Sequence, residues 1–223
     1  MKAPLGIEEL AALKRYDAPT IANAVETFDV RLWTEGFMSP SIRCIFPELG
    51  TMAGYAVTGR IRASQSGGGA YSRHGWWEAI LRHPAPRVIV LEDVDDPPVG
   101  AFWGEVQTNI HKALGCIGTV TNGGVRDLTE VRGAAFHYFA ASIMVSHAYV
   151  QLLDYGEPVS VGGVTIRTGD LIHADQHGVQ VVPIEIAPQL PAACEAIIAK
   201  ERRIIAYCQS NEFSLEGLKK LIP

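Results

Sequence analysis

The stretch AFWGEVQTNIHKALGCIGTVTNGGVRD, residues 101–127, decides the fold class. It opens with a short apolar run over 101–103, continues with a helix-like segment over 105–114, and returns to β-branched residues over 117–121. A strand, a helix and a strand in this order predict a βαβ unit, in which both strands lie parallel and the crossover is right-handed. The segment therefore predicts an α/β fold built on a parallel sheet.

The flanking sequence extends this pattern on both sides. Helical spacing predicts helices over 7–16, 19–28, 76–82, 184–210 and 216–222, with Asp17 as a cap. Short β-branched runs predict strands over 53–61, 87–92, 138–142, 159–166, 171–174 and 179–182. The run over 87–92 is almost wholly apolar, which favours a strand buried on both faces. The polar, glycine-rich segment 64–75 predicts a loop.

Composition places the chain among globular proteins and excludes several functional classes. Of its 223 residues 48% are apolar and 19% charged, which suits one domain with a substantial core. A net charge of −5 without a basic block argues against a nucleic-acid partner. No apolar run suits a signal peptide or a membrane span. The four cysteines lack metal-binding spacing, so we expect Cys116 and Cys194 to be core residues. A reducing cytoplasm is the expected location of the protein.

Candidate functional residues follow the two strands of the βαβ unit. The second strand is predicted to stop at the paired glycines 123 and 124 and then to present Arg126 and Asp127. Neighbouring parallel strands open their carboxyl ends into one crevice, so Glu105 should meet this pair. Arginine offers a planar fork to a carboxylate, and aspartate is a hard ligand for Mg²⁺ or Mn²⁺. The backbone amides at the start of the helix that begins at Glu105 add a binding site for an anion. This set suits chemistry on a 2-oxo acid.

These residues also resemble a known signature. The pattern Glu-x20-Arg-Asp-x2-Glu, at Glu105, Arg126, Asp127 and Glu130, resembles that of the RraA-like superfamily. This superfamily includes the class II 4-hydroxy-4-methyl-2-oxoglutarate/4-carboxy-4-hydroxy-2-oxoadipate aldolases. Three further segments are similar to family motifs, namely 53–58, 162–170 and 174–183.

The resemblance implies a swivelling β/β/α domain with N-terminal helices. Residues 1–223 would form one domain, with a core over about 15–183 and a C-terminal helical arm over 184–223. It implies a homotrimer or homohexamer with active sites between subunits. It further implies a metal-dependent lyase that cleaves 2-oxo acids by a retro-aldol reaction, releases pyruvate and decarboxylates oxaloacetate.

The resemblance assigns roles to individual residues. Asp127 would bind Mg²⁺ or Mn²⁺, and Arg126 would contact the pyruvate part of the substrate. Backbone amides after Gly104, at Val106 and Gln107, would hold the substrate carboxylate. The residues implied to order water around the metal are Glu105, Glu130 and, from a neighbouring subunit, Glu201.

Other interpretations stay open at this point. Arg126 and Asp127 could form a surface pair at a helix start, where aspartate is favoured as a cap. Glu130 and Glu201 could simply be solvated, and His147 is expected in the core or at an interface. Arg73 and His74 are either substrate contacts or part of a plain loop.

A second function is a non-catalytic RraA-like protein that binds and regulates a ribonuclease. Family members of that kind are shorter, whereas this chain continues for forty residues past Pro183, which favours the enzyme. A methyltransferase is disfavoured because no glycine-rich cofactor loop is followed by an acidic residue at the required distance.

Overall fold

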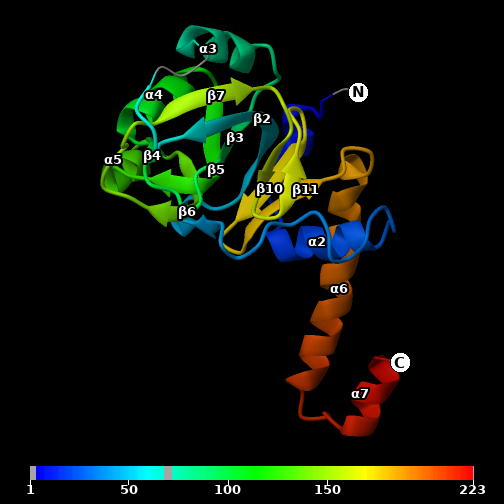
Figure 1. Ribbon diagram of the computed structural model, residues 1–223. Helices are drawn as coiled ribbons and strands as arrows, with labels where there is room; N and C mark the ends of the chain where they lie inside the picture. Colours follow the sequence, from blue (N-terminus) through cyan, green and yellow to red (C-terminus); the bar gives the residue numbers. More distant parts are fainter. Residues whose placement is uncertain (1–3, 68–71, 223) are drawn as a thin grey trace.

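The computed structural model describes residues 4–67 and 72–222, and the chain folds around one mixed sheet (Figure 1). The helices are α1 (Ile7–Leu13), α2 (Ala18–Glu26), α3 (Arg73–Leu81), α4 (Glu105–Ala113), α5 (Leu128–Gly133), α6 (Leu190–Cys208) and α7 (Leu215–Leu221), with 3-10 turns η1 (Pro47–Leu49) and η2 (Ala187–Gln189). The strands are β1 (Arg43–Cys44), β2 (Met52–Arg62), β3 (Arg87–Asp93), β4 (Ala101–Trp103), β5 (Cys116–Val125), β6 (His137–Ile143), β7 (Gln151–Tyr155), β8 (Val159–Val161), β9 (Val164–Ile166), β10 (Leu171–Asp175) and β11 (Gly178–Val182).

The sheet combines a parallel centre with antiparallel additions. Its strand order is β1-β6-β5-β3-β2-β10-β11, with β4 paired to β5 and β7 paired to β2. Strands β2, β3, β5 and β6 run parallel to their neighbours in this centre. Strand β4 also lies parallel to β5, with Ala101 opposite Gly124 and Trp103 opposite Val125. The α/β class and the predicted βαβ unit over β4, α4 and β5 are therefore confirmed.

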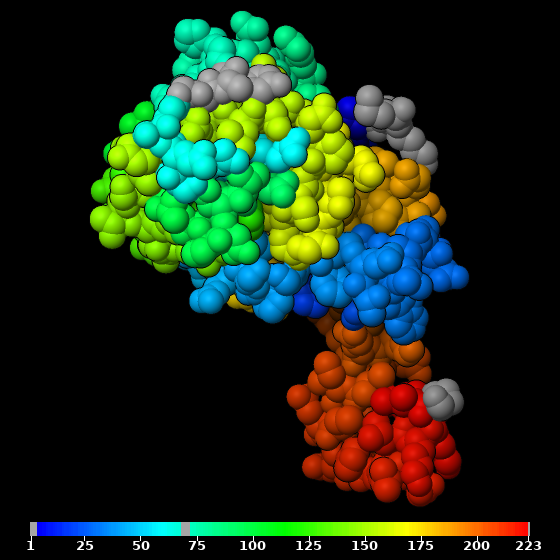
Figure 2. All heavy atoms as spheres, in the orientation of Figure 1, coloured from blue at the N-terminus to red at the C-terminus, as the bar shows by residue number. Residues whose placement is uncertain are grey.

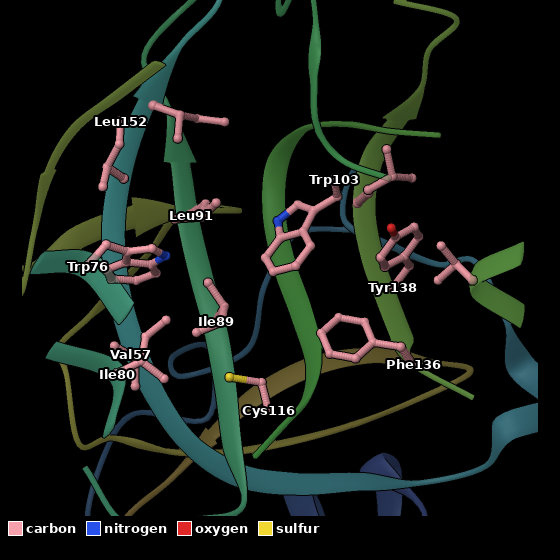
Figure 3. Close-up of a cluster of buried hydrophobic side chains, with 14 of the residues drawn as sticks. Val57, Trp76, Ile80, Ile89, Leu91, Trp103, Cys116, Phe136, Tyr138 and Leu152 are labelled. Atoms are coloured by element: carbon pink, nitrogen blue, oxygen red, sulfur yellow. The ribbon is translucent and has the colours of Figure 1, made fainter. Parts of the chain in front are cut away.

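Side chains of β3 alternate between two hydrophobic layers, as expected for a strand covered on both faces. Val88 and Val90 pack on the face that carries the β8–β9 hairpin. Ile89 and Leu91 point into the opposite layer, beneath α3 and α4 (Figure 3). The largest side chains of that second layer are Trp76, Trp103, Tyr138, Phe46 and Phe136. The two layers hold the carboxyl ends of the central strands in a fixed position.

A third layer joins α1, α2 and the start of α6 to the sheet beside β10 and β11. Leu190 and Cys194 are buried there, and Cys116 is buried in the layer under α3, so both predicted core cysteines are confirmed. Beyond this contact α6 leaves the body and α7 folds back beside it as a separate arm (Figures 1 and 2). None of the helices within residues 4–67 and 72–222 is both long and apolar enough to cross a bilayer.

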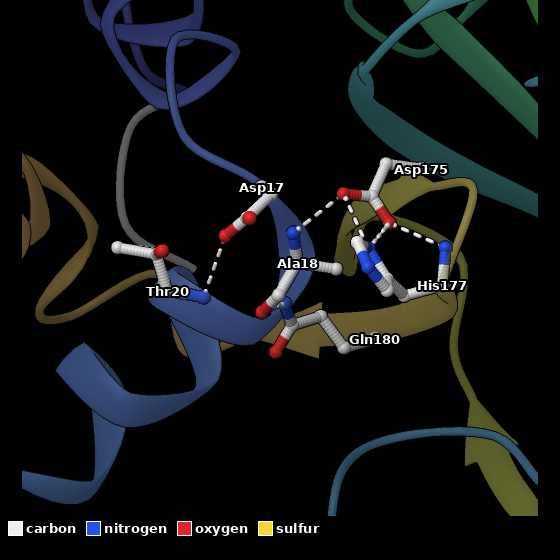
Figure 4. Close-up of polar contacts among 6 residues, drawn as sticks. All are labelled: Asp17, Ala18, Thr20, Asp175, His177 and Gln180. Atoms are coloured by element: carbon white, nitrogen blue, oxygen red, sulfur yellow. Dashed lines mark hydrogen bonds and ion pairs between the residues drawn. The ribbon is translucent and has the colours of Figure 1, made fainter.

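Buried polar contacts fix the start of α2 against the β10–β11 turn (Figure 4). Asp17 caps the helix as predicted, since its Oδ1 accepts the Thr20 N–H at 2.9 Å. Asp175 Oδ2 accepts the Ala18 N–H at 2.8 Å, and Gln180 Nε2 donates to the Ala18 carbonyl at 2.8 Å. The two hydrogen bonds to Ala18 satisfy backbone groups that would otherwise be buried without a partner.

The predicted end of β5 is wrong. The strand does not stop at the paired glycines but continues through them to Val125, with a register shift between Thr121 and Gly124 in its pairing with β6. A Cβ on Gly123 would lie 2.8 Å from Asp93 Oδ2, and one on Gly124 would lie 2.5 Å from Met144 Sδ. The glycines therefore serve close packing within a strand, a role that the sequence does not distinguish from a turn.

Two other elements depart from the sequence prediction. Helix α3 begins at Arg73, so residues 73–75 are helical and not part of the predicted loop. Ser72 caps this helix, since its Oγ accepts the His74 N–H at 3.2 Å. Residues 68–71 of that loop lie outside the described part of the chain. Strand β7 was not predicted, because its short sequence QLLDY carries a polar residue at each end of the apolar pair and shows weak strand character.

Candidate functional site

An open pocket of about 360 Å³ lies at the carboxyl ends of β4 and β5. The predicted site residues Gly104, Val106, Gln107, Arg126 and Asp127 all line it. The rest of its described wall is formed by Gly67, Arg73, Ala101, Phe102, His147, Ala148, Tyr149 and Val150. Two regions far apart in sequence, 101–107 and 126–127, thus meet at the sheet edge where parallel α/β folds place their ligands.

Asp127 connects the two strand ends directly. Its Oδ2 accepts the N–H of Glu105, the first residue of α4, at 2.8 Å and lies 3.8 Å from Arg126 Nε. Although Asp127 occupies the N-cap position of α5, its side chain makes no capping hydrogen bond to that helix. Its φ is 55°, a left-handed conformation that is uncommon outside glycine and recurs at functional sites. Asp127 therefore does not cap α5 through its side chain, whereas the ion pair with Arg126 that the alternative interpretation expected is present.

Gly104 allows this close approach. A Cβ at this position would collide with Asp127 Oδ2 and lie 3.2 Å from Arg126 Nε. Its backbone is extended, with φ at −156°, so conformation alone does not demand glycine here. The reason for glycine is the space that the carboxylate and the guanidinium occupy.

The start of α4 presents free amide groups at the pocket. The first hydrogen bond of the helix runs from the Thr108 N–H to the Gly104 carbonyl at 3.0 Å. The preceding N–H groups of Val106 and Gln107 have no acceptor among residues 4–67 and 72–222. Free amides at a helix start carry partial positive charge and suit a carboxylate.

None of the three glutamates implied to order water around the metal lines this pocket. Glu105 contributes its backbone N–H, but its side chain is exposed and does not line the pocket. Glu130 is exposed on α5, and Glu201 is exposed on the arm formed by α6 and α7 (Figure 1). Of the predicted site residues, the arginine–aspartate pair and the α4 amides therefore converge on the pocket.

A divalent cation fits this site with a single protein ligand. No group of three or more histidine, cysteine, aspartate or glutamate side chains that could enclose a metal occurs in the part of the chain that the structure describes. Asp127 Oδ2 is occupied by the Glu105 N–H, while Oδ1 makes no hydrogen bond to any described residue. An aspartate with one oxygen held and one free suits a hard cation whose other ligands are water and substrate.

Some residues of the pocket wall were not predicted from the sequence. The segment 147–150 follows β6 and carries no motif, yet it forms one side of the pocket. The core position expected for His147 is wrong, because this side chain is exposed and faces the pocket. Asn122 accepts the Asp93 N–H at 2.7 Å and donates to the Asp93 carbonyl at 2.8 Å. An aspartate could accept but not donate there.

A buried histidine holds α3 against α4. His111 Nε2 accepts from Trp76 Nε1 at 3.0 Å, and its Nδ1 lies 2.7 Å from the Gln107 carbonyl. Both contacts are satisfied by a neutral ring with its proton on Nδ1. Burial lowers the pKa of His111 to about 4, against the smaller opposing effect of the Gln107 carbonyl. This link fixes α3 beside the helix whose first turn borders the pocket.

We expect the His111→Gln variant to lose part of the acid sensitivity of the fold. The unfolded chain takes up the His111 proton near pH 6.5, whereas the folded chain does so only near pH 4. The free energy of unfolding therefore falls as the pH drops through this window, by roughly 3 kcal/mol for this residue. Glutamine cannot take up the proton, so chemical denaturation from pH 7 to 4 should show a shallower loss of stability.

The exposed His147→Gln variant is the matched control and should keep the full pH slope. Burial also lowers the pKa of His137 to about 4, so some acid sensitivity remains in His111→Gln. An unchanged slope in His111→Gln would contradict the assignment of a neutral, doubly bonded ring.

Comparison with curated proteins gives partial sequence matches. DlpA of Legionella pneumophila is 33% identical over 127 residues, which are 56% of this chain and 20% of DlpA. A Halalkalibacterium halodurans protein named "Putative 4-hydroxy-4-methyl-2-oxoglutarate aldolase" is 30% identical over 100 residues, or 44% of this chain and 48% of that protein. The chain thus spans about half, or less, of the length of these relatives.

Solved structures match over nearly the whole fold, and a family model matches most of the chain. An uncharacterized protein from Pseudomonas syringae is 25% identical, with a TM-score of 0.75 over 99% of this chain and 96% of its own. RraAS2 of Streptomyces coelicolor, titled an unusual member of the RNase ES inhibitor RraA protein family, has a TM-score of 0.69 over 92% of this chain and 98% of its own. Its 20% identity supports the fold alone. Because residues 18–181 match the model described as RraA-like, Aldolase/RraA, the chain belongs to the RraA-like family.

Proposed function

We propose that this protein is a divalent-metal-dependent lyase of 2-oxo acids that releases pyruvate by retro-aldol cleavage and also decarboxylates oxaloacetate. The observation that carries the proposal is the convergence of Arg126, Asp127 and the free amides of Val106 and Gln107 on one pocket. A guanidinium and two amides bind a carboxylate, and an adjacent free carboxylate oxygen binds a hard cation. A 2-oxo acid presents both partners, a carboxylate beside a carbonyl oxygen.

The residues of the chain divide the reaction between them. The amides of Val106 and Gln107 would hold the substrate carboxylate, and Gly104 leaves room for the Asp127 carboxylate beside it. In the retro-aldol reaction, the C4 hydroxyl would give its proton to water and become a carbonyl as the bond between C3 and C4 breaks. The electron pair of that bond would form the enolate of pyruvate, and C3 would then take up a proton from water. With oxaloacetate, C4 would leave as CO₂ and the same enolate would form. Arg126 supplies a fixed positive charge where this negative charge develops. A Mg²⁺ or Mn²⁺ ion on Asp127 would, when bound, act as a Lewis acid for the 2-oxo group.

Assembly would complete the site. Glu201 lies on the arm, beyond the buried start of α6, and does not line the pocket of its own chain. In the proposed homotrimer or homohexamer, the arm of one subunit would bring this carboxylate to the pocket of the next. The glutamate would then order water at the site.

A metal-dependence assay tests the proposed function. Purified protein would be incubated with Mg²⁺ and either oxaloacetate or 4-hydroxy-4-methyl-2-oxoglutarate, and pyruvate would be followed over time. We expect pyruvate release that stops with EDTA and returns when Mg²⁺ or Mn²⁺ is added in excess. No release from either substrate, together with binding to a ribonuclease, would instead support the regulatory function.

Gly104→Ala should abolish most of this activity without unfolding the protein. The added methyl group would displace the Asp127 carboxylate and crowd Arg126, so we expect kcat/KM to fall by about 100-fold, roughly 3 kcal/mol of transition-state stabilisation. Steady-state kinetics with oxaloacetate and a thermal melt would measure the two effects. Gly133→Ala is the control, because a Cβ there meets nothing within 4 Å. Equal activity in both variants would contradict the steric role of Gly104.

A further inference from the structure

Arg73 is a cation in the pocket without a partner among residues 4–67 and 72–222. Its side chain lines the pocket together with Arg126 and Asp127, although it comes from the first residue of α3, outside the βαβ unit. It makes no hydrogen bond or ion pair with any residue of the described ranges 4–67 and 72–222. By contrast, the half-buried Arg60 is paired with Asp154, and the exposed Arg132 is paired with Glu48. An unpaired guanidinium at a pocket wall is available to an anionic ligand.

Arg73 also lines a second pocket that the arginine–aspartate pair does not line. This small pocket of about 20 Å³ adjoins the first and shares with it Arg73, Phe102, Gln107 and Val150. Neither Arg126 nor Asp127 lines this extension, which instead reaches Trp76, Trp77, Gln151 and Leu152. A ligand bound at the Arg126 end would therefore present its other end to Arg73.

The position of Arg73 is fixed by buried contacts one turn along α3. Trp76 follows three residues later on the same face of the helix, is 2% exposed, and donates to His111 of α4 at 3.0 Å. Helix α4 in turn supplies the free amides of the first pocket. Helix α3 thus provides Arg73 at one end of the proposed ligand site, and helix α4 provides the free amides at the other. The buried Trp76–His111 hydrogen bond joins the two helices.

The charge of the pocket favours a ligand with two negative groups. Its described wall contains two arginines and a single acidic side chain, Asp127, although the chain as a whole has a net charge of −5. One carboxylate at Arg126 and the α4 amides would leave Arg73 unpaired. A second carboxylate would pair it, in a pocket that screens charge less than bulk water.

We propose that Arg73 selects substrates that carry a second carboxylate at the end of the molecule remote from the 2-oxo acid group. Arg73 thereby determines specificity and takes no part in bond breaking. This inference rests on the proposed function, because it requires that the 2-oxo acid group bind at Arg126.

Two five-carbon probes of equal length test the inference by binding alone. 2-Oxoglutarate and 2-oxopentanoate differ only in that the first carries a distal carboxylate and the second a methyl group. Isothermal titration of the full chain with each probe and with pyruvate, in the presence of Mg²⁺, would measure the three affinities. The variants are Arg73→Ala, Arg73→Lys and the control Arg82→Ala, which removes an exposed arginine at the other end of α3.

We expect the native protein to bind 2-oxoglutarate 10- to 100-fold more tightly than 2-oxopentanoate. Arg73→Ala should abolish this preference without weakening the binding of pyruvate. Arg73→Lys should retain part of the preference, because lysine keeps the positive charge but lacks the planar fork of donors. Arg82→Ala should leave the preference intact. Pyruvate binding without any preference, or a preference that survives in Arg73→Ala, would overturn the role of Arg73 and leave the proposed function standing. Failure of pyruvate and both probes to bind would overturn both.

Discussion

Asp127→Asn should lower kcat/KM for metal-dependent pyruvate release by at least about 1000-fold, equivalent to roughly 4 kcal/mol of transition-state stabilisation. Asparagine has the same shape, and its side-chain oxygen can still accept the Glu105 N–H that Asp127 Oδ2 accepts at 2.8 Å. The connection between β5 and α4 should therefore survive, while the negative charge that attracts a cation is lost. The variant separates the chemical role of this carboxylate from its structural role.

Three measurements complete this prediction for Asp127. Initial rates with oxaloacetate would give kcat/KM, Mn²⁺ binding followed by electron paramagnetic resonance would give the metal affinity, and a thermal melt would report on the fold. Glu78→Gln removes an acidic side chain that is 71% exposed on α3 and should match the native protein in all three. Native activity in Asp127→Asn would exclude this residue as the metal ligand.

Arg126→Ala should raise KM for 2-oxo acids and also lower kcat, with a combined loss in kcat/KM of about 100- to 1000-fold. Arg126 is 34% exposed and lines the pocket, so its guanidinium can reach both a bound carboxylate and the charge that develops on cleavage. Arg126→Lys should recover only part of the loss, because an ammonium group lacks the planar fork that matches a carboxylate.

The control for Arg126 is Arg132→Ala, which removes an exposed arginine from the neighbouring helix α5. Arg132 pairs with Glu48 at 2.6 Å on the surface, and such a pair contributes at most about 1 kcal/mol to stability. We expect native kinetics for this variant. A loss in Arg126→Ala no larger than that in Arg132→Ala would show that Arg126 does not contact the substrate.

The meeting of the Glu105 backbone with Arg126 and Asp127 could be predicted from the sequence because it depends on one local rule, although the Glu105 side chain does not line the pocket. Neighbouring parallel strands joined by a helix open at the same edge, and β4, α4 and β5 follow that rule. The sequence also indicates the two-sided burial of β3, since a short uninterrupted apolar run is typical of a strand covered on both faces. In both cases the prediction needs only elements that follow one another in the chain or the composition of a single strand.

Other parts of the site depend on contacts that no local pattern encodes. The glycines 123 and 124 look like a turn in sequence, but Asp93 and Met144, distant in the chain, pack against them and keep them in a strand. Segment 147–150 becomes a pocket wall only because β6 ends beside β5. The position of Arg73 likewise depends on the Trp76–His111 hydrogen bond, which joins helices that are separate in sequence.

The most direct test of the proposed site is a crystal structure of the protein with pyruvate and Mn²⁺, recorded with anomalous diffraction to locate the metal. We predict an anomalous peak on Asp127 Oδ1, with the pyruvate carboxylate at Arg126 and at the amides of Val106 and Gln107. A metal peak away from Asp127, or pyruvate bound without contact to Arg126, would contradict this prediction.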